Sequence, residues 1–126
     1  MNIINIVKNN KKVLICGKDS SGKTGFMKSI VIKLSKDEHI LVLSNHNEIK
    51  REALNHNNVE LLHKPKDCTY VDMKFLKTDA NYIFIDEICE NIEEICDNLQ
   101  DKHLIFVKTV NDELEEKDKE FFDSII

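Results

Sequence analysis

The three glycines of this 126-residue chain all lie within nine residues, in the stretch VLICGKDSSGKTGF that runs from Val13 to Phe26. Glycine is needed where the backbone turns through positive φ, or where another group must approach the main chain closely. A compact apolar run, Lys12–Cys16, precedes the glycines and is typical of a buried strand. Apolar residues at helical spacing follow them and predict a helix from about Gly22 to Leu34. The chain must therefore fold around a strand, a glycine-rich turn and a helix.

The turn from Gly17 to Thr24 reads G-x-x-x-x-G-K-T, the pattern of the phosphate-binding P-loop. Backbone N–H groups of such a loop form a nest for an anion, and the positive end of the helix points to the same place. We expect Lys23 to reach the β- and γ-phosphates and the Thr24 hydroxyl to bind Mg²⁺. An ordinary strand–turn–helix corner would need one glycine and would have no use for Lys-Thr. The predicted nucleotide-binding residues are Gly17, Lys18, Asp19, Ser20, Ser21, Gly22, Lys23, Thr24 and Gly25.

Strand and helix patterns alternate along the rest of the chain, which indicates an α/β fold with a mainly parallel sheet covered on both faces. The further predicted strands are His39–Leu43, Tyr82–Ile85 and His103–Val107, with a short strand or edge segment at Asn57–His63. The further predicted helices are a polar helix or turn at Glu48–Leu54, a helix through Val71, Phe75 and Leu76, and an amphipathic helix through Ile92, Ile95, Cys96 and Leu99.

Two carboxylates, Asp86 and Glu87, follow directly after the apolar run Tyr82–Ile85. A strand that points toward the P-loop would place Asp86 beside the phosphates, because open α/β sheets bind ligands at the carboxyl ends of their strands. We expect Asp86 to hold Mg²⁺ through its waters, and Glu87 to orient and deprotonate the water that attacks the γ-phosphate. Glu87 and Lys23 are thus the predicted catalytic residues. In the alternative interpretation, Asp86 caps the helix that follows, a common role for aspartate.

The composition is that of a globular protein, and the length predicts a single domain over residues 1–126. No apolar run approaches the ~20 residues of a membrane span, and the N-terminus lacks the features of a signal peptide. The cysteines never form a C-x-x-C pair, which favours reduced structural thiols in a cytoplasmic protein over a zinc site. They are Cys16, Cys68, Cys89 and Cys96.

The net charge of −5 has a local origin in the C-terminal segment. Residues 112–126 hold seven acidic residues and two lysines, so the remainder of the chain is neutral. No basic stripe indicates a nucleic-acid partner. The segment places Leu114, Phe121, Phe122 and Ile125 on roughly one helical face. It is predicted to be either a docked C-terminal helix or a helix that binds a protein partner.

From about Lys11 to Asp112 the chain resembles a minimal core of the secretion ATPases, the hexameric P-loop motors of type II and type IV secretion and of pilus extension and retraction. Besides the P-loop, LVLSNHNEI stands at the family's acidic box and HNNVELL at its hPNVVxL-like segment. IFIDEICE stands at its Gly-Glu-Ile-Arg-Asp site, and HLIFVKTVND at its last strand. The resemblance implies a RecA-like three-layer sandwich that binds ATP or ADP with Mg²⁺.

The sequence departs from the family where the family's coupling residues lie. Ser44 and Asn45 occupy the acidic-box positions, Cys89 replaces an arginine, and Val110 stands near the position of a histidine. Glu87 is retained, and Asp86 replaces the preceding glycine.

Three functions remain open at this point. The first is a slow Mg²⁺-dependent ATPase, and the second is a nucleotide-dependent module that regulates or docks onto a protein partner without significant hydrolysis. The third is a small nucleoside or nucleotide kinase, in which Asp86 or Glu87 accepts a proton from a substrate hydroxyl. A kinase lid usually carries arginines that clamp the transferred phosphate, and this chain has only one arginine, Arg51. Self-association also stays open.

Overall fold

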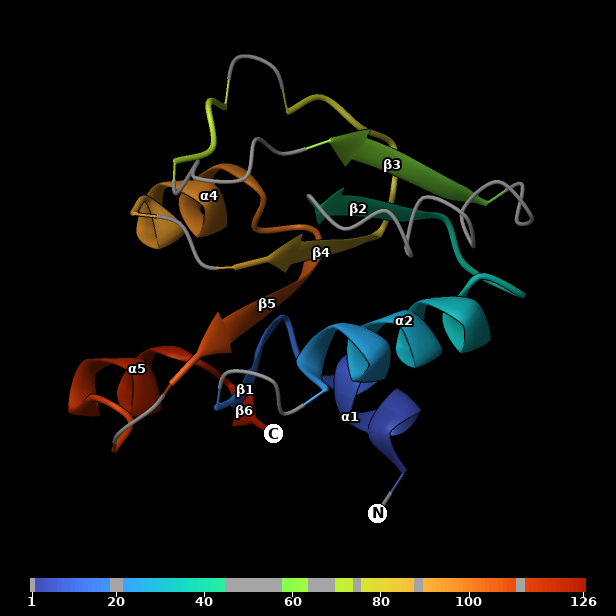
Figure 1. The fold of residues 1–126 in the computed structure, drawn as a ribbon. Helices are drawn as coiled ribbons and strands as arrows, with labels where there is room; N and C mark the ends of the chain where they lie inside the picture. Colours follow the sequence, from blue (N-terminus) through green and yellow to red (C-terminus); the bar gives the residue numbers. More distant parts are fainter. Residues whose placement is uncertain are drawn as a thin grey trace.

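The computed structural model describes residues 2–18, 22–44, 58–63, 70–73, 76–87, 90–110 and 113–126. Within these residues, six strands form one sheet of order β3-β2-β4-β5-β1-β6, in which every pair is parallel (Figure 1). The strands are β1 Lys12–Gly17, β2 Ile40–Ser44, β3 Val59–His63, β4 Tyr82–Asp86, β5 His103–Thr109 and β6 Ser124–Ile125. The helices are α1 Ile3–Asn9, α2 Lys23–Leu34, α4 Ile92–Asn98 and α5 Glu116–Phe121.

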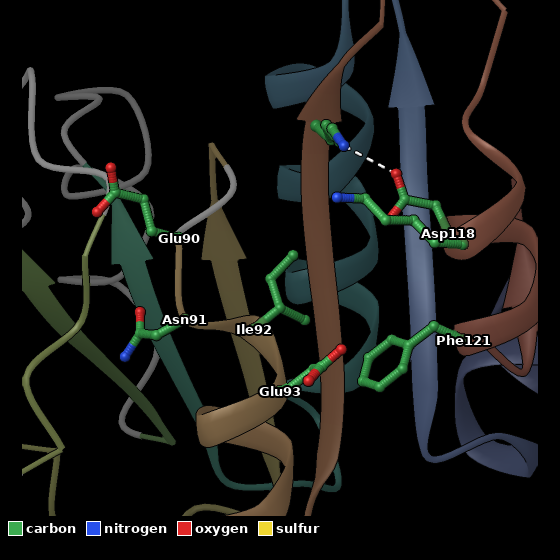
Figure 2. Close-up of a pocket in the computed structure, with 8 residues that line it drawn as sticks. Glu90, Asn91, Ile92, Glu93, Asp118 and Phe121 are labelled. Carbon is green, nitrogen blue, oxygen red and sulfur yellow. Dashed lines mark hydrogen bonds and ion pairs between the residues drawn. The ribbon is translucent and has the colours of Figure 1, made fainter.

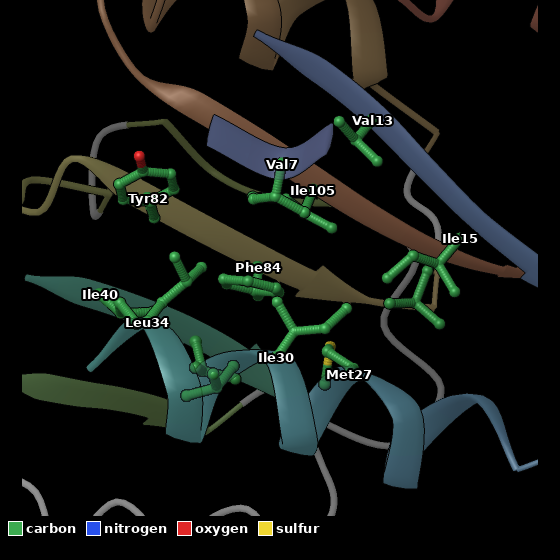
Figure 3. Close-up of a cluster of buried hydrophobic side chains, with 13 residues drawn as sticks. Val7, Val13, Ile15, Met27, Ile30, Leu34, Ile40, Tyr82, Phe84 and Ile105 are labelled. Carbon is green, nitrogen blue, oxygen red and sulfur yellow. The ribbon is translucent and has the colours of Figure 1, made fainter. Parts of the chain in front are cut away.

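Helices cover both faces of the sheet. On one face, side chains of α1 and α2 pack on alternate residues of β1, β4 and β5, a cluster that includes Met27, Ile30 and Phe84 (Figure 3). On the other face, α4 and the C-terminal segment pack on the intervening residues, among them Phe106. The central strands β2 and β4 are buried at every residue, as expected for parallel strands covered on both sides. The protein is therefore an α/β protein with an all-parallel sheet, an arrangement compatible with a RecA-like sandwich.

The predicted strands are confirmed, with boundaries that differ by one or two residues. The segment predicted as a short or edge strand is β3, which lies at the edge of the sheet beside β2. The predicted first helix begins at Lys23 and ends at Leu34, and the amphipathic helix after β4 begins at Ile92. Continuous apolar runs in a parallel sheet are the patterns most easily assigned from sequence, because both faces of each strand are buried.

The docked C-terminal helix predicted within residues 112–126 is confirmed over only part of that segment. Only Glu116–Phe121 is helical, and Ser124–Ile125 forms β6 beside β1. The backbone N–H of Asp123 donates to Lys12 O at 2.8 Å, and that of Ile126 donates to Leu14 O at 2.8 Å. These bonds satisfy groups of β1 on the side away from β5, whereas a continued helix would leave that side of β1 without a strand.

The helix predicted through Val71 and Leu76 is absent from residues 70–73 and 76–80, which are irregular in the described structure. Both side chains are buried as the pattern required. The backbone of Val71 bonds instead to the amide of Asn91, which accepts from its N–H at 3.0 Å and donates to its carbonyl at 2.6 Å. Phe75 and the predicted polar helix or turn at Glu48–Leu54 lie outside the described residues.

Two cysteines fall within the described residues, and both are free thiols. Cys96 is buried on the inner side of α4, and this burial raises the pKa of its thiol to about 11. The thiol therefore stays protonated near neutral pH and acts as a small apolar side chain. No helix among the residues described is long and apolar enough to span a membrane.

Candidate phosphate-binding site

The carboxyl ends of the strands bring the predicted site residues to one edge of the sheet. Gly17 ends β1 and Asp86 ends β4, and the strand between them, β5, ends at Thr109. Gly17 is paired with Thr109, and Asp86 with Val107. The ends of β1 and β4 are thus separated by two strand spacings, about 10 Å, across the sheet, and Gly17 lies two residues farther along the strand direction than Asp86. Open parallel sheets bind ligands at such an edge.

The glycine loop joins β1 to α2 at this edge. Gly22 is the N-terminal cap of α2 and has left-handed backbone angles, φ 85° and ψ 21°. The ammonium of Lys23 donates to the carbonyl of Lys18 at 2.9 Å, so this side chain folds back over the start of the loop. Asp19, Ser20 and Ser21 lie outside the described residues, as does the side chain of Thr24. The described part of the loop therefore has a glycine-dependent turn and a cation directed at its opening.

Two glycines of the loop differ in what they require, and this difference predicts opposite effects of the same substitution. A Cβ added at Gly22 or at Gly25 would meet no atom within 4 Å, so neither glycine is needed for packing. Gly22→Ala is expected to lower the free energy of unfolding by about 1–2 kcal/mol, because an L-residue is strained at positive φ. Gly25→Ala is expected to raise it by about 0.5–1 kcal/mol, because Gly25 lies in helix α2. Urea denaturation of both variants measures the difference, and an equal loss in both would contradict this interpretation.

Asp86 is completely buried at the end of β4. The hydroxyl of Ser44, at the end of the neighbouring strand β2, donates to its Oδ2 at 3.1 Å. The helix-capping interpretation of Asp86 is wrong for α4, because that helix begins at Ile92 and its N-cap position is Asn91. Buried carboxylates are costly unless they are hydrogen-bonded, paired or bound to a cation, so a fully buried aspartate at a ligand-binding edge marks a candidate functional group.

Glu87 has an unusual backbone for a residue with a side chain, because its φ is +59°. Such a conformation costs of order 1–3 kcal/mol and is found where the surrounding structure holds it in place. The hydroxyl of Thr109 lies 3.3 Å and 3.4 Å from the two carboxylate oxygens of Glu87 and donates to them. Beyond Thr109, the N–H of Val110 donates to the carbonyl of Gly17 at 2.9 Å. The end of β5 therefore connects Glu87 to the start of the glycine loop.

Thr109 and the Ser44–Asp86 contact were not predicted as parts of the site. The sequence signal for Thr109 is a hydroxyl residue that closes the apolar strand HLIFVKT. That signal becomes meaningful only when β5 is known to lie between β1 and β4. In the sequence, Ser44 and Val110 stand out only as departures from the secretion-ATPase pattern. Asn45 and Cys89 lie outside the described residues.

A Mg²⁺ site at this edge would need few ligands from the protein. Among the residues described, no group of three or more His, Cys, Asp or Glu side chains is placed to hold a metal ion. Mg²⁺ commonly binds through one or two carboxylates, with phosphate oxygens and waters completing its shell. Asp86 would supply the carboxylate, and the glycine loop would hold the phosphates.

A cavity of about 330 Å³ opens beside the loop. It lies between the end of β1, the start of α2 and the C-terminal strand. Its lining consists of Ile15, Cys16, Gly17, Gly22, Lys23, Phe26 and Ile126. The loop and this cavity share Gly22 and Lys23, so a ligand held by the loop has room to extend into the cavity.

Another cavity, of about 310 Å³, lies on the opposite face of the sheet, between α4, β5 and α5 (Figure 2). Within it, the ammonium of Lys108 lies 2.8 Å from the carboxylate of the nearly buried Asp118. Successive residues of a strand point to opposite faces, so Lys108 points away from the face that carries Thr109. The ion pair holds α5 against β5 on the face of the sheet opposite Thr109.

Comparisons of this chain with protein-family models, curated proteins and solved structures give no match.

Proposed function

We propose that this protein binds a nucleoside triphosphate with Mg²⁺ at the carboxyl edge of its sheet and hydrolyses it slowly. In this proposal the chain is a P-loop nucleotide-binding protein of RecA-like architecture, related to the secretion and pilus ATPases. The observation that carries the proposal is the Lys23 ammonium folded over a glycine loop, on the edge where β4 ends at Asp86 and Glu87 follows it.

The loop and the first turn of α2 would hold the phosphates. Backbone N–H groups between Gly17 and Gly25 would surround them, and the N-terminal end of a 12-residue helix adds its positive dipole. Lys23 would exchange its bond to Lys18 for bonds to the β- and γ-phosphates. Thr24 and Asp86 are the residues that would hold Mg²⁺, which neutralises charge on the phosphates when it is bound.

Glu87 would orient and deprotonate the attacking water. Its carboxylate accepts the Thr109 hydroxyl, which holds it at the edge between the loop and Asp86. The strained backbone of Glu87 supports this role, since strained conformations cluster at functional sites. Phosphoryl transfer depends mostly on positioning and charge stabilisation, and a fixed carboxylate and a fixed cation would supply part of both.

Nucleotide binding is tested by ligand-induced stabilisation. ATP with Mg²⁺ is expected to stabilise the fold by about 2.7 kcal/mol at a concentration 100 times the dissociation constant. ADP is expected to act in the same direction. Lys23→Ala is expected to abolish most of this gain, because it removes the cation at the loop.

Lys33→Ala is the matched control, since Lys33 is an exposed lysine at the other end of α2. It is expected to keep the full gain in stability. The measurement is the free energy of unfolding with and without nucleotide. If the unmodified protein gains no stability from any nucleotide, the proposal fails.

One observation favours a second candidate, a nucleotide-dependent binding module with no significant hydrolysis. Beside Asp86, the chain places Ser44, a hydroxyl, where the resembled family carries an acidic residue that is thought to activate water. Phosphate release from ATP separates the two candidates, because the binding module would show the gain in stability without turnover. The described residues do not test the kinase hypothesis, because the only arginine of the sequence, Arg51, lies outside them.

A further inference from the structure

The cavity beside the glycine loop carries an aromatic residue at a position that the phosphate site does not use. Phe26 follows Lys23 by three residues, so the two side chains lie on the same side of the first turn of α2. Phe26 is 36% exposed, whereas the next residue, Met27, is fully buried in the core. Phe26 thus keeps part of its surface exposed where it lines the cavity.

The lining of this cavity offers apolar surface and few hydrogen-bonding groups. Its apolar lining residues are Ile15, Phe26 and Ile126, together with Cys16. The N–H of Cys16 donates to the carbonyl of Ile126 at 3.1 Å, and the N–H of Ile126 donates to β1 at 2.8 Å. Among the described lining residues, the only charged side chain is that of Lys23, and the proposed function assigns it to the phosphates.

The cavity is large enough for the part of a nucleotide that lies beyond its phosphates, and it is continuous with the phosphate loop. Its volume of about 330 Å³ falls in the range of about 300–1,000 Å³ that is usual for small-molecule sites. It shares Gly22 and Lys23 with the phosphate loop. A ligand whose phosphates lie in the loop would therefore extend a flat, weakly polar group into the cavity, along the ring of Phe26.

We propose that this cavity holds the nucleoside part of the bound nucleotide, with the base stacked on Phe26, and that it discriminates weakly between bases. The inference rests on the proposed nucleotide-binding function. Stacking on an aromatic ring discriminates little between bases, because every base presents a π-face. Strong selection would need hydrogen-bonding groups that read the edges of the base. Among the described lining side chains only Lys23, which is assigned to the phosphates, and the thiol of Cys16, which donates to the carbonyl of Ile126 at 3.6 Å, can form hydrogen bonds.

The test compares nucleotides with a probe that has phosphates but no base. Binding of ATP, GTP, CTP and inorganic tripolyphosphate, each with Mg²⁺, is measured by titration calorimetry for the unmodified protein and for Phe26→Ala. The substitution is expected to weaken ATP binding by about 5- to 150-fold, the range found when an aromatic partner of a base is removed. Tripolyphosphate binding is expected to change by less than twofold, and ATP, GTP and CTP to bind the unmodified protein within tenfold of one another.

Two further variants serve as controls for the effect of Phe26→Ala. Lys23→Ala is expected to weaken ATP and tripolyphosphate alike, which separates the phosphate site from the base site. Leu62→Ala removes another exposed apolar side chain, 40% exposed on the distant edge strand β3, and is expected to leave both affinities unchanged. Circular dichroism of each variant verifies that the fold is retained.

Each alternative outcome contradicts a different claim: the stacking on Phe26, the weak discrimination between bases, or the proposed function itself. Unchanged ATP binding in Phe26→Ala, or an equal loss for ATP and tripolyphosphate, overturns the stacking assignment and leaves the proposed function standing. A preference above tenfold for one base overturns weak discrimination. If neither ATP nor tripolyphosphate binds the unmodified protein, the proposed function fails, and this inference fails with it.

Discussion

Replacement of Glu87 by glutamine is expected to reduce ATP turnover by about 10²- to 10⁴-fold, the usual contribution of a general base, and to leave ATP affinity unchanged. The glutamine carbonyl can still accept the Thr109 hydroxyl, so the local structure is retained. The amide cannot take a proton from water. Phosphate release and equilibrium ATP binding, measured on the same preparation, separate the two effects.

Thr109→Val is the matched variant, because it removes the hydroxyl that bonds Glu87 and preserves the shape of the side chain. Turnover is expected to fall less than in Glu87→Gln, since the carboxylate remains but loses its fixed orientation. Thr109→Ser, which restores the hydroxyl, is expected to recover most of the activity. Turnover by Glu87→Gln at the rate of the unmodified protein would show that another group activates the water.

The strands and the main helices could be predicted because their signals are local. β4 and β5 are continuous apolar runs, and α2 repeats its apolar residues at helical spacing. The C-terminal segment could not be predicted, because the apolar residues Phe121, Phe122 and Ile125 suit one helical face as well as a short helix followed by a strand. Pairing with β1 decides between them, and that pairing joins residues more than 100 positions apart.

The candidate site was predictable in its residue types and not in its contacts. The pattern at Gly17–Thr24 and the carboxylates Asp86 and Glu87 could be assigned from the sequence. The sequence does not give the order of strands, which places β5 between β1 and β4. The contact from Thr109 to Glu87 follows from that order, and the contact from Ser44 to Asp86 follows from the pairing of β2 with β4. These two contacts therefore depend on the order of the strands in the sheet, which local sequence patterns do not reveal.

The isolated chain is expected to turn over ATP far more slowly than about 1 s⁻¹, the lower end for efficient phosphoryl-transfer enzymes. Many P-loop enzymes receive an arginine that stabilises the transition state and is worth about 10³–10⁵ in rate. The sequence has one arginine, Arg51, and Cys89 stands where the resembled family has an arginine. Lysine supplies charge but lacks the planar fork of a guanidinium, so Lys23 cannot replace it fully.

Sedimentation with ATP and Mg²⁺, combined with turnover measured over a range of protein concentrations, tests this expectation. We expect a monomer or a weakly associating species whose rate per chain is low and does not depend on concentration. A rate that rises with concentration would indicate that a second copy completes the site, with Arg51→Lys as the variant that removes the guanidinium and retains the charge. A stable hexamer with turnover near 1 s⁻¹ would contradict the prediction, because the site would then reach full activity with the residues of this chain alone.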